Sequence, residues 1–252
     1  MSSDIVFLIL AGVASFVVGM SKGGLPMVGL LSVPLLSLSI SPVMAAGLLL
    51  PIFIISDVYG LWIYRKEFDT RNIAIIVPAS MIGIGVGWAT ASITSEDLVK
   101  ILVGVIGLAY CADAILKSRR DLPPRPADVP RGVFWGSIAG FTSFVSHAGG
   151  PPYQMYVLPQ RLDKMVYAGT STIIFAIINL LKLPPYWMLG QVNLASIEKA
   201  VYLAPIAILG AYVGYKITKT IPQKIFFRLV EVALLLVSIT LVYEGASALL
   251  RR

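Results

Sequence analysis

The chain has 252 residues, of which 57% are hydrophobic and only 13% are charged, and its mean hydropathy is +0.85. Soluble globular chains carry about 25% charged residues, so this composition excludes an ordinary soluble domain. The net charge is +7, but the basic residues stand in short loops between apolar runs, a pattern that is typical of membrane proteins and argues against nucleic-acid binding.

Apolar runs recur along the whole chain, and most are long enough to cross the ~30 Å hydrocarbon core of a bilayer. In chain order they lie near 4–20, 25–39, 42–64, 72–93 and 97–117, and then near 131–146, 150–160, 165–183, 194–215 and 223–250. We therefore predict an all-α polytopic membrane protein with about five helical segments in each half of the chain.

Similar residues occur in the same order in the two halves of the chain. The matches place Lys22, Gly23, Gly24, Leu25 and Pro26 over Ala148, Gly149, Gly150, Pro151 and Pro152, then Asp57 over Asn179, and then Gly83 and Gly87 over Gly210 and Gly214. They predict one transmembrane domain with an N-terminal repeat at 1–117, a cytoplasmic linker at 118–130 and a C-terminal repeat at 131–252.

The first two segments of each half are short, and they flank Gly-rich breaks at 20–26 and 146–152. They form either two tilted spans or a re-entrant hairpin, and both options return the chain to its starting side. Each half then crosses the membrane an odd number of times, so the repeats are inverted. With the linker in the cytoplasm, most basic residues lie on that side, which puts both termini outside. This placement leaves outside Lys100, Lys182, Lys199, Arg251 and Arg252.

The first break places a cation in apolar surroundings, which marks a candidate functional site. Gly23 and Gly24 allow a tight turn, and a helix that starts inside the membrane offers unpaired N–H groups and a positive dipole end to an anion. We expect Ser21, Lys22 and the N–H groups of residues 23–25, up to Leu25, to bind substrate. The alternative is that the glycines only allow close packing and that Lys22 snorkels to the cytoplasmic face.

The second break repeats this arrangement with Ser146, His147, Gly149 and Gly150, and Gln154 follows it. Two such helix starts near the bilayer midplane would hold a small oxyanion between them. His147 is the only histidine, and it acts either as a structural hydrogen-bonding group or as a donor at the site.

Asp57 is the one carboxylate well inside a predicted span, and its counterpart is Asn179. An intramembrane Asp carries a coupling proton, pairs with Lys22 or holds an unwound backbone in place. We expect no metal site, because no second His or acidic cluster lies near His147, and no bound cofactor. A phosphate-binding loop is absent, so the chain alone does not use ATP.

A secondary transporter of anions fits these features best, with a passive anion channel or an uptake permease as the alternative. An intramembrane hydrolase is a remote one, since its only candidate pair is Ser146 and His147, and adjacent helical residues do not face each other. We therefore expect no enzymatic activity.

The breaks, taken as Gly19–Met27 and as Gly140–Phe144 running into His147–Pro152, resemble the sulfite exporter TauE/SafE family of membrane permeases. The resemblance implies export of sulfite or of sulfonates such as sulfoacetate across the bacterial inner membrane. Its implied partners are a small anion, the lipid bilayer and a coupling proton or other ion, and it leaves a homo-oligomer open.

Overall fold

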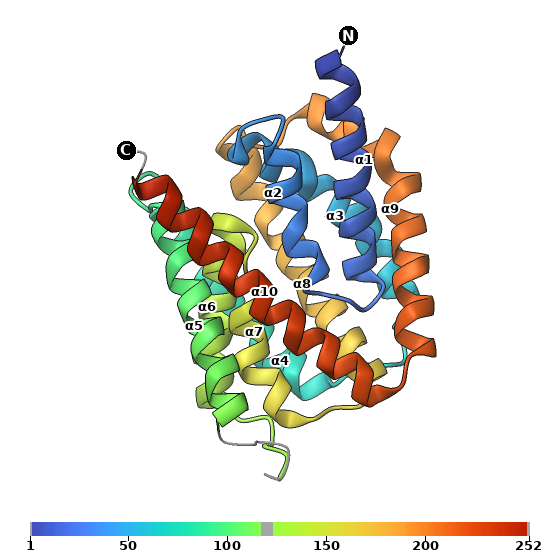
Figure 1. Cartoon of the computed structure of the whole chain (residues 1–252), viewed down its shortest axis with the longest axis vertical. Helices are drawn as coiled ribbons and strands as arrows, with labels where there is room; N and C mark the ends of the chain where they lie inside the picture. Colours follow the sequence, from blue (N-terminus) through green and yellow to red (C-terminus); the bar gives the residue numbers. More distant parts are fainter. Residues whose placement is uncertain (1, 117–122, 251–252) are drawn as a thin grey trace. The chain divides into compact units, whose positions relative to one another are not determined.

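The computed structural model describes residues 2–116 and 123–250, and all its regular elements there are helices (Figure 1). The beginning of the predicted linker, up to residue 122, and Arg251 and Arg252 lie outside the described residues. The helices are α1 (Ser2–Lys22), η1 (Val28–Leu31), α2 (Ser32–Ser37), α3 (Pro42–Ile63), α4 (Thr70–Ala89), α5 (Glu96–Leu116), α6 (Val129–Ser146), α7 (Gly150–Val157), η3 (Leu158–Gln160), α8 (Lys164–Met188), α9 (Leu194–Thr220) and α10 (Gln223–Leu250).

Every predicted segment is confirmed as a helix or as a pair of short helices, with ends that differ by a few residues. The α8 and α9 helices continue furthest beyond their predicted ends at 183 and 215, to Met188 and Thr220, and α8 does so through Pro184 and Pro185. Membrane helices tolerate proline because neighbouring groups satisfy the freed backbone carbonyls.

By length and composition, six helices of the described chain can cross a membrane. They are Ile5–Lys22, Val43–Ile63, Thr70–Ala89, Lys164–Met188, Leu194–Thr220 and Gln223–Leu250. The α2 and α7 helices have six and eight residues. At about 1.5 Å per residue they rise only about 9 and 12 Å, so neither helix crosses the bilayer without the residues beside it. The choice between two tilted spans and a re-entrant hairpin stays a prediction.

The helices pack into two compact units, and each unit draws helices from both halves of the chain. The first unit comprises Met1–Asp69 and Lys164–Pro222, and the second comprises Thr70–Asp163 and Gln223–Arg252. The predicted repeats are continuous stretches of sequence bounded at 117 and 131, whereas these units are groups of helices packed in space. The repeat boundaries therefore stay a prediction.

In the first unit, the ends of α1 and α3 lie together. Lys22, the last residue of α1, forms an ion pair with Asp57, and the Tyr64 hydroxyl just after α3 donates to Gly23 O at 2.7 Å. The two helices are therefore parallel, and the segment between them brings the chain back to the side where α1 began.

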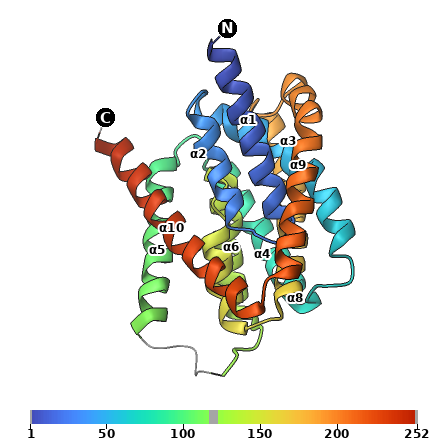
Figure 2. The same ribbon diagram turned by 45° about the vertical axis from the view of Figure 1, so that its right-hand side comes forward.

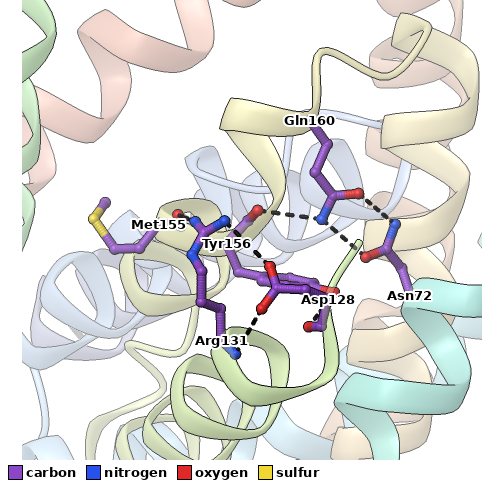
Figure 3. A network of polar contacts seen from close by, with 6 residues as sticks. All are labelled: Asn72, Asp128, Arg131, Met155, Tyr156 and Gln160. Atoms are coloured by element: carbon purple, nitrogen blue, oxygen red, sulfur yellow. Dashed lines mark hydrogen bonds and ion pairs between the residues drawn. The ribbon is translucent and has the colours of Figure 1, made fainter. Parts of the chain in front are cut away.

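In the second unit, the end of α7 meets the start of α6. The Tyr156 hydroxyl donates to Asp128 O at 3.2 Å, and Asp128 caps α6 by accepting from Arg131 N–H at 3.0 Å (Figure 3). Asn72 and Gln160 exchange two amide hydrogen bonds of 2.9 and 3.0 Å, which fasten the end of this hairpin to α4. The short segments after α1 and α6 therefore both lead the chain back toward the side where those helices began, as predicted.

Corresponding helices of the two halves run antiparallel. In the first unit, α3 and α8, the third helices of the two halves, contact each other through Asp57 and Asn179. The start of each helix packs just beyond the end of the other, Gly47 on Gln191 O and Gly169 on Glu67 O. In the second unit, α5 and α10 are side by side in both views, with Lys100 3.8 Å from Glu244 and Gly107 against Ser238 (Figures 1 and 2). Antiparallel counterparts are what inverted repeats require, so the predicted fold class is confirmed.

The first helix of each half packs on the fourth helix of the other half, and the two contacts are alike. In both, a glycine backbone rests directly on a carbonyl oxygen of the partner helix, and small residues allow this close approach. The contacts are Gly19 with Ala207 and Gly210 with Phe16 between α1 and α9 (Figure 2), and Gly140 with Ser80 and Gly83 with Ser137 between α4 and α6.

We expect Gly169→Ala to destabilise the protein. A Cβ there would lie 1.8 Å from Glu67 O, so α8 must move away from the end of α3. Overpacking of this kind costs about 1–3 kcal/mol, and it should lower the thermal unfolding midpoint of the detergent-purified protein. Gly85→Ala is the control, because its Cβ would meet nothing within 4 Å. Equal midpoints for the two variants would contradict the contact.

Candidate functional site

The first break is the C-terminal end of α1, shaped by a left-handed glycine. Gly24 has φ +112°, which residues with a Cβ rarely adopt. Leu25 N–H donates to Met20 O at 3.3 Å and Gly24 N–H to Ser21 O at 3.4 Å. These two bonds form a Schellman cap, which satisfies carbonyl groups at the end of the helix.

This cap corrects one expectation about the break. The N–H groups of Gly23, Gly24 and Leu25 all donate to carbonyl groups of α1, with Gly23 N–H 3.0 Å from Gly19 O. They do not face an anion as the sequence predicted, because the helix end uses them itself. Contact of these three residues with substrate by other atoms stays a prediction.

Lys22 is buried, with 3% of its surface exposed, and its Nζ lies 2.8 Å from Asp57 Oδ1. The Phe53 ring centroid lies 5.0 Å from the same nitrogen, and Thr172 of α8 donates to Lys22 O at 3.3 Å. The alternative that Lys22 snorkels to the membrane surface is therefore wrong.

Asp57 is held from two sides. Its second oxygen, Oδ2, accepts from Asn179 Nδ2 at 2.8 Å, and both side chains are buried. Of the roles that the sequence left open for Asp57, pairing with Lys22 is the one that this geometry displays. The repeat counterparts Asp57 and Asn179, recognised by alignment, thus meet in space.

Lys182 joins this group, although the sequence analysis placed it outside the membrane. It is fully buried inside α8, one turn after Asn179, and its Nζ lies 5.9 Å from the Tyr186 ring centroid. It interacts electrostatically with both Lys22 and Asp57. The sequence analysis counted it among the basic residues on the outer side and did not predict its burial; its sidedness stays a prediction. Its spacing of three residues from Asn179 was the available signal, because such residues share a helix face.

We call Lys22, Asp57, Asn179 and Lys182 the buried charged cluster. Among the residues that the structure describes, Lys22, Asp57 and Lys182 are the charged side chains that are buried. Buried ionisable side chains at membrane depth are costly and mark a candidate functional site, so this cluster is the candidate anion site of the first unit.

The second break has a different helix end. The α6 helix ends at Ser146, and His147 adopts the left-handed conformation with φ 54°, its N–H donating to Ser143 O at 3.2 Å. Pro151 and Pro152 follow in the first turn of α7 and have no N–H. Of the residues at this helix start, Gly149 and Gly150 therefore retain N–H groups, and their contact with substrate stays a prediction.

Gln154 carries an unsatisfied polar group. It is fully buried, and neither Nε2 nor Oε1 has a hydrogen-bond partner among the residues that the structure describes. Such a group costs about 1–3 kcal/mol, so it calls for a bound water or ligand.

The two serines of the breaks are less available than the sequence suggested. Ser21 Oγ donates to Val18 O at 2.6 Å, and Ser146 Oγ donates to Thr142 O at 3.2 Å. Each hydroxyl has one hydrogen, so both can accept but not donate to an anion in this arrangement.

Within the described part of the chain, no group of three or more His, Cys, Asp and Glu residues could hold a metal ion. Antiparallel counterpart helices, several candidate membrane spans and a buried charged cluster are typical of a polytopic membrane transporter. The family model described as sulfite exporter TauE/SafE matches residues 7–241, nearly the whole chain, and the chain belongs to this family. No curated protein and no solved structure matches it.

We expect Asp57→Asn to destabilise the protein more than Lys22→Gln. The first change leaves the buried Lys22 ammonium group without its ion-pair carboxylate, whereas the second leaves Asp57 with the hydrogen bond from Asn179 and the attraction of Lys182. Breaking a buried pair costs about 3–5 kcal/mol, and the double variant should recover part of the loss because neither charge of the pair remains.

Thermal unfolding of the purified variants in detergent measures this order. An Asp57→Asn protein as stable as the unmodified chain, or a double variant less stable than both single variants, would contradict the pairing.

Proposed function

We propose that this protein is a secondary transporter that exports small sulfur-containing anions, such as sulfite or a C2 sulfonate like sulfoacetate, across the bacterial inner membrane. Membership of the family supports the transport of sulfite or related anions. The observation that carries the proposal is the buried charged cluster, in which two lysines lie on candidate membrane-spanning helices of the first unit.

In this proposal Lys22 and Lys182 attract the anion electrostatically, while Asp57 and Asn179 hold Lys22 in place. Gln154, Gly149 and Gly150 belong to the second unit, and their contact with substrate stays a prediction from the sequence. Contact of both breaks with one anion, a role for His147, alternating access by rocking of the repeats and a coupling proton or other ion stay predictions from the sequence.

No observation favours the intramembrane hydrolase. The Ser146 hydroxyl hydrogen is directed to Thr142 O, so it is not positioned for transfer to His147. The passive channel and the uptake permease differ from the exporter in kinetics and direction, which a transport assay separates.

We expect proteoliposomes loaded with unlabelled sulfite or sulfoacetate to accumulate the labelled anion transiently, because a carrier exchanges substrate across the membrane. Lys22→Ala should abolish this counterflow while leaving membrane insertion normal, because the cluster then loses one positive charge and leaves Asp57 without its ion-pair partner. Lys199→Ala, at an exposed lysine of α9, is the control and should behave like the unmodified protein.

Four results are informative. Flux without counterflow indicates a channel, and accumulation by right-side-out vesicles alone indicates uptake. Chemical conversion of the labelled anion would indicate an enzyme. Full activity of Lys22→Ala would refute the role of the cluster in transport.

For orientation, we propose that both termini lie outside. Cys111 is the only cysteine, so single-cysteine variants on a Cys111→Ser background report sidedness cleanly. A membrane-impermeant maleimide should label Ser92→Cys on intact cells, and should label Lys66→Cys only after the membrane is opened. The reverse pattern would invert the proposed topology.

A further inference from the structure

The start of α7 collects hydrogen-bond donors inside the second unit. The N–H groups of Gly149 and Gly150 donate to no backbone carbonyl among the residues that the structure describes, and all eight residues of α7 are buried. The positive end of the helix dipole lies at the same place and attracts oxygen atoms that carry negative charge. Unpaired N–H groups begin every helix, however, so they do not define a site alone.

Gln154 supplies the second observation. It is fully buried, and neither Nε2 nor Oε1 has a hydrogen-bond partner within the described part of the chain. A long side chain in a helix is directed toward the N-terminus and covers the turn that precedes it. Gln154 is the fifth residue of α7, so its amide is directed toward the turn that begins at Gly150.

The two ends of this amide set different conditions on a ligand. Nε2 is a donor and needs an acceptor oxygen, whereas Oε1 is an acceptor and needs a hydrogen from the ligand. A buried amide with one end unsatisfied keeps the desolvation cost of that end. The ligand that satisfies Gln154 therefore brings both an acceptor oxygen and an O–H group.

Hydrogen bonding, rather than ion pairing, distinguishes ligands at this helix start. The buried charged side chains of the described residues, Lys22, Asp57 and Lys182, all belong to the first unit. A site built to hydrogen-bond a ligand hydroxyl discriminates against an analogue without it, because the polar group of the site is then left unpaired.

We propose that the start of α7 is a substrate-binding site in which Gln154, with Gly149 and Gly150, recognises a sulfur oxyanion that also carries an O–H group. Hydrogensulfite in its S–OH form carries both groups itself. A sulfonate without a hydroxyl, such as sulfoacetate, brings a water as the donor and binds less tightly. This inference rests on the proposed function, and it specifies the hydrogen-bonding pattern of the substrate.

The test compares two anions of equal charge and similar size, 2-hydroxyethanesulfonate and propane-1-sulfonate, which differ by a hydroxyl in place of a methyl group. Both compete with labelled sulfite for counterflow in proteoliposomes. The unmodified protein should prefer 2-hydroxyethanesulfonate by about fivefold to tenfold, as expected for one hydrogen bond to a buried amide.

Two matched variants locate this preference. Gln154→Met keeps the length of the side chain but removes both polar ends, so the preference should disappear. The same variant should unfold in detergent at a temperature no lower than that of the unmodified protein, because it removes a buried amide without a protein partner. Gln223→Met makes the same change at an exposed glutamine of the second unit and should leave the preference unchanged.

Equal competition by the two sulfonates in the unmodified protein would overturn the inference. An unchanged preference in Gln154→Met would also overturn it, and would indicate that the amide binds a structural water only. If Gln154→Met does not fold, the competition in the unmodified protein decides alone. Absence of any sulfite counterflow by the unmodified protein would instead overturn the proposed function itself.

Discussion

The ion pair between Lys22 and Asp57 is the contact on which the first unit depends. It joins the end of α1 to the middle of α3 at 2.8 Å, and Asn179 extends it to α8. A lysine at membrane depth needs such a partner, and the partner in turn fixes where α1 ends. The left-handed turn at Gly24, the return of the chain toward α3 and the position of Lys182 all follow around this pair.

The scaffold is symmetric, but its charge is not. Asp57 and Asn179 are repeat counterparts of similar shape, and they meet where α3 and α8 cross. The counterpart of Lys22 is Ala148, and at the offset that relates Asp57 to Asn179 the counterpart of Lys182 is Gly60. Both lysines therefore lie in the first unit, one from each half of the chain. Duplication accounts for the inverted framework, whereas the asymmetric positions of the two lysines account for the proposed anion site.

Much of this fold could be predicted from the sequence, because apolar segment length and the order of glycine matches depend on local composition. The alignment identified Asp57 and Asn179 as repeat counterparts, but their contact appears only in the structure. Lys182 was counted on the outer side because the predicted segment ended at 183, whereas α8 continues to Met188. Burial decides the role of a cation, and burial depends on packing that apolar periodicity does not describe.

The hydrogen bonding of the first break could not be predicted from the sequence either. Gly23 and Gly24 predicted a turn correctly, but two uses of its N–H groups were compatible with the same residues: binding an anion or capping α1. The left-handed conformation of Gly24 favours the cap. Side chains, rather than backbone N–H groups, therefore provide the positive charge at this break.

A cryo-electron microscopy map of the protein in lipid nanodiscs at saturating sulfite tests the central claim most directly. The account predicts density for one anion beside the Nζ atoms of Lys22 and Lys182, with Asp57 still in contact with Lys22. A map in which Lys182 faces lipid or bulk water, or in which the anion lies far from both lysines, would contradict it.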